Sequence, residues 1–333
     1  MNNRRNFIKT TSLAGIGVGL TAFSLPGEPE IVKGKRIGII GLDTSHSIAF
    51  TREFNSAEPD PLLGGYRVVA AYPHGSRDIE SSVSRIPGYT EDIQKFGVTI
   101  VDSIDELLNV SDVILLETND GRLHLEQAMP VLKEGKRMFI DKPMTASLKD
   151  AIAIFDEANR LNVPVFSCSS LRYMENTQKV AQGEFGKVYG ATSWSPATIE
   201  KTHPDLFWYG IHGVETLFTA MGKGCKSVTR FFSEGTDVVT GKWVDGRIGT
   251  FRGIREGKAD YGGVAFTEKG VINLGPYQGY KPLLIEIARF FETGISPIDQ
   301  QETLEILAFM EAADESKRKG GAAINMPKFP GNP

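Results

Sequence analysis

A lysine that directly follows a predicted buried strand is the first candidate for proton transfer. Asp141-Lys142-Pro143 directly follows the apolar run 137–140, which is typical of a buried strand. A partly buried lysine at the end of a strand can have its pKa lowered enough to exchange protons near neutral pH. We predict Lys142 as a proton-transferring residue; the plainer alternative is an ordinary loop lysine.

A histidine in the second half of the chain is the next candidate. His212 lies in the apolar segment 205–221, which is predicted to be helical. Glu215 follows three residues later, so it falls on the same helical face and is expected to orient the imidazole. From the residues alone, a satisfied core histidine is the alternative, and it stays open.

Strand and helix patterns alternate regularly from 33 to 167, and this alternation must position Lys142. The sequence predicts strands at 36–41, 66–72, 98–101, 112–117, 137–140 and 163–166, and helices at 103–108, 123–133 and 148–161. Such alternation is typical of βαβ units and a parallel sheet. We therefore expect an α/β, Rossmann-type doubly wound domain with ligands at the carboxyl ends of its strands.

The chain from 168 to 333 has a different pattern, which positions His212. Strands are predicted in succession at 187–193, 227–233, 238–243, 248–253 and 264–266, with helices at 205–221, 283–292 and 303–318. Glycine turns separate these strands. The pattern predicts a second, α+β domain with an open, mostly antiparallel sheet.

Four segments in this order and spacing resemble the Gfo/Idh/MocA oxidoreductases. They are 39–41, 119–124, 141–143 and 210–212, and the resemblance extends from about 33 to 319. It implies an N-terminal NAD(P)-binding domain, a C-terminal substrate-binding and oligomerisation domain, and oxidation or reduction of sugars and polyols. It also implies that Lys142 reaches the nicotinamide and the substrate hydroxyl, and that His212 is the active-site histidine.

The glycine loop departs from the pattern of the family, which has G-x-G-x-x-G after the first strand. Gly41 matches the first glycine, but Asp43 stands at the second and His46 at the third. A carboxylate at Asp43 would face the cofactor phosphates, where a helix N-terminus favours an anion. Alternatively, Asp43 caps the helix while Thr44 and Ser45 offer hydroxyls to phosphate.

The remaining cofactor contacts are implied by the resemblance. Glu117 and Asn119 follow the fourth strand, His124 begins the next helix, and Pro143 completes the lysine motif. The strand ending at residue 72 has no acid for the ribose hydroxyls, while Ser76 and Arg77 suit a 2′-phosphate. NAD and NADP both remain open, as does a fold that binds no nucleotide.

The composition restricts the partners of the protein. The 333 residues are 41% apolar and 23% charged, with 37 basic and 41 acidic residues and a net charge of −4. These values exclude a disordered chain and give no sign of nucleic-acid binding. The two cysteines have no metal-binding spacing, so we expect no metal site.

The first thirty residues resemble a twin-arginine export signal. Arg4 and Arg5 precede Phe7 and Lys9, and an apolar stretch too short for an ordinary membrane span follows. We expect an exported, periplasmic protein with no stable membrane span once the signal is removed.

The sequence therefore predicts an exported NAD(P)-dependent oxidoreductase that transfers hydride to or from a sugar or polyol, as a homo-oligomer. One alternative is a redox-neutral, glycoside-cleaving enzyme with tightly bound NAD. Another is a nucleotide-free protein that binds a sugar or a partner.

Overall fold

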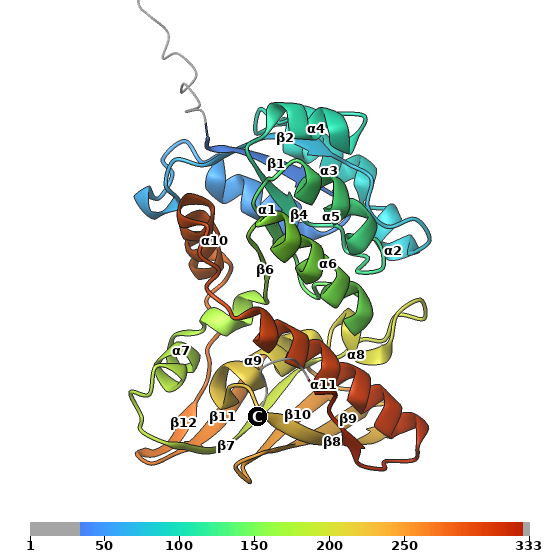
Figure 1. Ribbon diagram of the computed structural model, residues 1–333, viewed down its shortest axis with the longest axis vertical. Helices are drawn as coiled ribbons and strands as arrows, with labels where there is room; N and C mark the ends of the chain where they lie inside the picture. The colour runs from blue at the N-terminus through green and yellow to red at the C-terminus, as the bar shows by residue number, and fades with distance from the viewer. Residues whose placement is uncertain (1–33, 329–333) are drawn as a thin grey trace, which may run out of the picture. The chain divides into compact units, whose positions relative to one another are not determined.

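A parallel sheet forms the first domain. The computed structural model describes residues 34–328, and the predicted export signal at 1–30 lies outside them. Six parallel strands follow the order β3-β2-β1-β4-β5-β6 (Figure 1). They are β1 (Arg36–Ile40), β2 (Arg67–Tyr72), β3 (Thr99–Ile100), β4 (Val113–Leu116), β5 (Met138–Ile140) and β6 (Val165–Ser167). This order confirms the doubly wound fold, whose strand order reverses between β1 and β4.

Helices cover both faces of this sheet because its strands are apolar on both sides. One buried cluster joins the sheet to α1 (Ser45–Phe54) and α3 (Ile86–Gln94). The other joins it to α4 (Ile104–Val110), α5 (His124–Lys133) and α6 (Leu148–Leu161). A short helix, α2 (Glu80–Val83), follows β2. The sequence patterns did not indicate α2 or α3.

One helix from the C-terminal part of the chain belongs to the first domain. α10 (Lys281–Thr293) buries Leu283, Ile287 and Phe290 in the same cluster as β1 and α1. Figure 1 shows it beside α1. The predicted second domain, 168–333, therefore includes one helix, α10, that packs in the first domain instead. An amphipathic pattern reveals an apolar face, but not which sheet that face covers.

The second domain is built on a seven-stranded sheet of order β12-β11-β7-β10-β9-β8-β13. Its strands are β7 (Val188–Pro196), β8 (Cys225–Ser233), β9 (Thr236–Trp243), β10 (Ile248–Ile254), β11 (Gly262–Thr267), β12 (Gly270–Asn273) and β13 (Ile324–Asn325). Within the described residues of this second sheet, only β7 and β10 pair in parallel. The predicted α+β domain with a mostly antiparallel sheet is confirmed.

Two long helices, α9 (Ile211–Met221) and α11 (Gln300–Arg318), pack on one face of this sheet (Figure 1). A further helix, α7 (Glu175–Ala181), contacts α9. The predicted helix 205–221 is divided into α8 (Asp205–Trp208) and α9. Trp208 and Tyr209 lie at this break, and both line the cavity described below.

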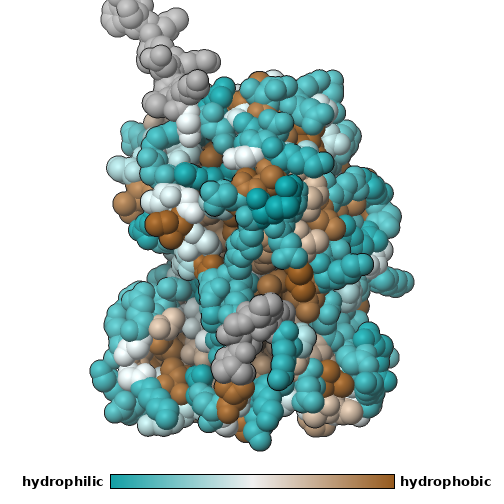
Figure 2. Space-filling model, in the orientation of Figure 1, coloured by the Kyte–Doolittle hydropathy of each residue, from teal (hydrophilic) through white to brown (hydrophobic). Residues whose placement is uncertain are grey.

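The surface shown in Figure 2 is predominantly hydrophilic, with apolar atoms in separate patches. Among residues 34–328, no helix is both long and apolar enough to cross a membrane.

Candidate active site

A cavity of about 560 Å³ lies at the carboxyl edge of the parallel sheet and is lined by both domains. The first domain contributes Lys142 and Asn119, and the second contributes His212 and Trp208. Lys142, the predicted proton-transferring residue, and His212, the predicted active-site histidine, thus line one cavity from opposite domains. This volume is ordinary for a small-molecule site.

Lys142 is held beside a buried carboxylate. Its side chain is 8% exposed, and its Nζ lies 3.6 Å from Oδ2 of Asp141. Burial alone would raise the pKa of Asp141, but the nearby His46 and Lys142 outweigh burial and hold that pKa well below its usual range. Asp141 is therefore an anion that keeps the ammonium group of Lys142 at the edge of the cavity.

His46, which stands at the third glycine position, is a site residue whose partners the sequence patterns did not indicate. It lies in the first turn of α1, where its Nδ1 is 2.8 Å from Oδ2 of Asp141. Its ring packs against those of Phe50 and Tyr280, at centroid distances of 5.4 and 4.9 Å. The residue that replaces the third glycine therefore joins α1 to the end of β5 and lines the cavity.

The expected partner of His212 is wrong. Nδ1 of His212 lies 2.8 Å from Oγ of Ser169, whereas Oε1 of Glu215 accepts a hydrogen bond from Nε of Arg172 at 2.5 Å. Spacing placed His212 and Glu215 on one helical face, but Glu215 finds a buried cation from the segment before α7. Ser169 therefore orients the imidazole.

His212 is a neutral imidazole. Burial, followed by the charges of Lys142 and His46, lowers its pKa well below the usual value. A neutral ring whose Nδ1 is engaged by a hydroxyl leaves Nε2 for a ligand, as acceptor or donor depending on the tautomer. This state suits proton exchange with a substrate hydroxyl.

The expectation that Asp43 faces the phosphates or caps α1 is corrected. Oδ2 of Asp43 accepts hydrogen bonds from the backbone N–H and the hydroxyl of Ser76, at 2.6 and 2.5 Å. Oδ1 accepts another from the backbone N–H of Asn119, at 2.9 Å. Thr44 caps α1 instead. The carboxylate is thus fully engaged by the loops after β2 and β4.

Gly41 retains the structural role of a first glycine. Its φ is +91°, and a Cβ there would lie 2.6 Å from the backbone nitrogen of Thr118. The loop after β1 therefore approaches the loop after β4 more closely than a side chain allows.

The other predicted cofactor residues divide into two groups. Thr44, Ser45 and Asn119 line the cavity, as does Lys142. In contrast, Gly41, Asp43, Glu117, His124 and Pro143 are buried and are not part of its lining. The two ring nitrogens of His124 face the backbone oxygens of Met144 and Thr118, at 2.9 and 2.6 Å, so this residue ties loops together.

The residues at the sheet edge fit a dinucleotide. The N-terminus of α1 meets the cavity at Thr44 and Ser45, and Arg85 adds a cation. Partial positive charge at a helix N-terminus, supported by a guanidinium group, suits a pyrophosphate. A second cavity of about 320 Å³ follows β2, with Tyr72 and Arg77 in its lining, at the place where an adenosine lies in such folds.

Comparison with known proteins agrees with this geometry. Residues 35–168 match the model of the Gfo/Idh/MocA family, described as an oxidoreductase family with an NAD-binding Rossmann fold. The first domain belongs to the Gfo/Idh/MocA oxidoreductases. The predicted family is thereby confirmed for this domain, and with it, at the level of the family, the expected oxidoreductase class and NAD-binding fold.

Individual relatives of this chain are distant. Glucose-6-phosphate 3-dehydrogenase of Bacillus subtilis is 27% identical over 143 residues, which are 42% of this chain and 35% of that protein. A structure from Thermotoga maritima, described as a probable dehydrogenase, superposes with a TM-score of 0.71 at 19% identity, covering 87% of this chain and 98% of that one.

Myo-inositol dehydrogenase from Lactobacillus casei, solved with NAD(H) and myo-inositol, superposes with a TM-score of 0.68 at 14% identity. The match covers 90% of this chain and 98% of that one. At such low identity these structures show the two-domain fold of this chain and nothing finer.

Proposed function

We propose that this protein is an NAD(P)-dependent oxidoreductase that transfers a hydride to or from a carbinol carbon of a sugar or polyol. The observation that carries the proposal is the meeting of Lys142 and His212 in one cavity at the carboxyl edge of a Rossmann sheet. Bound there, the nicotinamide would supply the hydride acceptor or donor.

The residues of the chain would handle the proton. In the direction of oxidation, a substrate hydroxyl between Lys142 and His212 has to lose a proton as the carbon loses its hydride. The neutral imidazole of His212 accepts that proton, and the ammonium group of Lys142 stabilises the developing oxyanion. Asp141 holds the ammonium group, and Ser169 holds the imidazole.

The cavity wall suits a carbohydrate. Tyr209, Tyr261, Tyr277 and Tyr280 line it together with Trp208, and together they offer aromatic faces and hydroxyl groups. Aromatic faces complement the C–H surfaces of a sugar ring, and hydroxyls pair with its polar groups. No carboxylate is part of the described lining of this cavity.

Activity on a panel of sugars and polyols, followed as NADH or NADPH absorbance with each cofactor, tests the proposal. We expect Lys142→Ala to lower kcat by about 10²- to 10⁴-fold on any true substrate. Lys149→Ala, which changes another lysine of the same domain outside the cavity, serves as the matched control. Undiminished turnover in Lys142→Ala would remove this lysine from the mechanism.

We further propose that the protein is exported by the twin-arginine route and forms a homo-oligomer. Arg4 and Arg5 support export. Exposed Ile248 and Phe266, on strands of the second sheet, support assembly. Fractionation of expressing cells, with Arg4 and Arg5 changed together to Lys, tests export, and light scattering tests assembly.

A further inference from the structure

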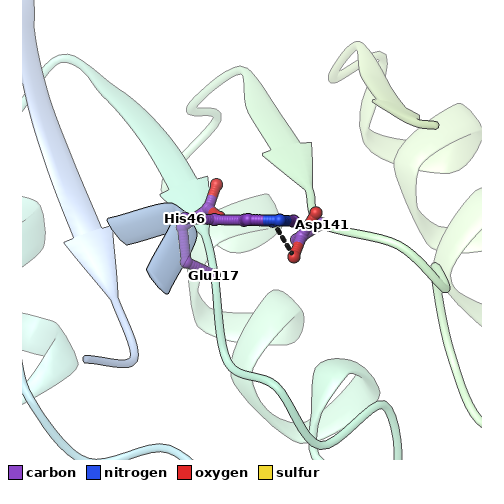
Figure 3. A group of neighbouring side chains, drawn as sticks. All are labelled: His46, Glu117 and Asp141. Carbon is purple, nitrogen blue, oxygen red and sulfur yellow. Dashed lines mark hydrogen bonds and ion pairs between the residues drawn. The ribbon is translucent and has the colours of Figure 1, made fainter. Parts of the chain in front are cut away.

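A group of three potential metal ligands lies beneath the cavity. His46 comes from the first turn of α1, Glu117 follows β4, and Asp141 follows β5 (Figure 3). One ligand atom from each residue lies within 4.8 Å of the others. Adjacent parallel strands bring the two carboxylates together, and the loop that replaces the glycine fingerprint brings the imidazole.

The carboxyl group of Glu117 is buried here without a hydrogen-bond partner among the described residues. Its residue is 0% exposed, and neither of its oxygens has a hydrogen-bond partner within residues 34–328. Oδ1 of Asp141 is also buried without a partner there. A buried carboxylate without a compensating partner is strongly unfavourable. Three unpaired oxygens on two neighbouring acids therefore indicate a missing positive group.

The neighbouring side chains of Lys142 and His46 do not pair with these oxygens. Nζ of Lys142 lies 3.6 Å from Oδ2 of Asp141, which is the oxygen that also contacts His46. The unpaired Oδ1 is the other oxygen of the same carboxylate. Both contacts thus fall on one oxygen of Asp141 and leave Oδ1 and both oxygens of Glu117 unpaired.

We propose that His46, Glu117 and Asp141 bind a divalent transition-metal ion, Zn²⁺ or Mn²⁺. Metal–ligand distances of about 2.0–2.2 Å allow ligand atoms up to about 4.4 Å apart, so the group closes on an ion with small movements. One imidazole and two carboxylates favour these ions over Ca²⁺, which prefers oxygen ligands alone.

The ion would act beside the cavity. His46 and Lys142 line the cavity, whereas Glu117 and Asp141 lie behind that lining. A dication at this place favours negative charge on a nearby substrate oxygen. Binding of the ion is a property of the three side chains, and it does not depend on the proposed hydride transfer.

Metal binding by the tag-free full chain tests the proposal directly. After dialysis against EDTA, the protein is titrated with Zn²⁺ alone by calorimetry and with Mn²⁺ alone by electron paramagnetic resonance. We expect about one ion per chain, an increase in Tm with the ion, and at least a tenfold loss of affinity in Glu117→Gln. The amide keeps the shape of the side chain and removes its charge.

Asp314→Asn is the matched control, because it removes a buried carboxylate of the second domain far from the three ligands in sequence. It should bind the ion as the unmodified chain does. The absence of saturable binding by folded protein, or equal affinity in Glu117→Gln, would overturn the proposal. Dinucleotide binding is measured separately on the metal-free chain, so failure of the metal site and failure of the proposed function are distinguishable.

Discussion

Asp43 and Ser76, 33 residues apart, are joined by two hydrogen bonds of 2.6 and 2.5 Å from the backbone N–H and the hydroxyl of Ser76 to one carboxylate oxygen. Asp43 stands where a Rossmann fingerprint has its second glycine, so the contact shows how this loop accommodates a side chain. The carboxylate is not part of the cavity lining and ties the loop after β1 to the loop after β2. A glycine loop can therefore lose its second glycine and leave the N-terminus of α1 open to an anion.

Asp43→Ala should destabilise the first domain. The substitution removes three hydrogen bonds to a buried carboxylate and leaves the N–H groups of Ser76 and Asn119 unpaired. We expect a loss of about 3 kcal/mol in the free energy of unfolding, measured in urea. Asp102→Ala, at an exposed position, is the control and should change stability little. Equal stability of the two variants would contradict the role given to Asp43.

Gly41→Ala should lower the Tm more than the same change at another glycine of positive φ. A Cβ at Gly41 would lie 2.6 Å from the backbone of Thr118, whereas a Cβ at Gly97 meets nothing within 4 Å. Both changes carry the strain of a positive φ, about 1 kcal/mol, but only the first forces the loops after β1 and β4 apart. Thermal unfolding compares them, and a similar fall in Tm would show that the close approach is unimportant.

Ser169→Ala should lower kcat with little change in KM. It should also cost about 1 kcal/mol of stability, because Oγ of Ser169 accepts a hydrogen bond from the backbone N–H of Leu171 as well. The hydroxyl of Ser169 holds Nδ1 of His212 at 2.8 Å, and a free imidazole samples unproductive orientations. We expect a fall of about 10- to 100-fold in kcat. Ser169→Thr, which keeps the hydroxyl, should retain most of the activity. A variant that loses stability instead, with no rescue by threonine, would assign Ser169 a structural role alone.

Much of this architecture follows from sequence periodicity. The contacts between residues far apart in the sequence do not. The alternation of strands and helices places Lys142 at the ligand edge because the carboxyl ends of parallel strands share one edge. The partner of His212 was missed because helical spacing gives a shared face, not the competing cation that Arg172 brings to Glu215.

The group beneath the cavity was missed for a related reason. His46 and Asp141 are 95 residues apart, and Glu117 lies between them in sequence without a motif that links the three. The departure of the glycine loop from the family pattern indicates His46, but not the two carboxylates that lie beside it.

The stability of the second domain should fall as pH rises towards neutrality because of Asp314. Burial raises the pKa of this carboxyl to about 7, although Nη1 of Arg230 donates to its Oδ1 at 2.5 Å. The folded protein thus binds the proton more tightly than the unfolded chain, whose aspartates have a pKa of about 3.9. This contribution to stability is present below about pH 4 and is lost as pH rises to about 7.

Asp314→Asn removes this titration. Urea unfolding at pH 5 and pH 8 should therefore show the variant gaining stability relative to the unmodified chain at the higher pH, by about 1 kcal/mol or more. A difference between the two proteins that is the same at both values would show that Asp314 has an ordinary pKa.

Binding of a dinucleotide by the full chain is the measurement that tests the central claim most directly. Native mass spectrometry after addition of NAD⁺ or NADP⁺ reports both the occupancy and the choice of cofactor. The geometry of α1, Arg85 and the two cavities predicts one dinucleotide per chain, with weaker binding in Arg85→Ala. If folded protein binds neither cofactor in excess, the cavity serves another ligand, and Lys142 and His212 lose the roles assigned to them.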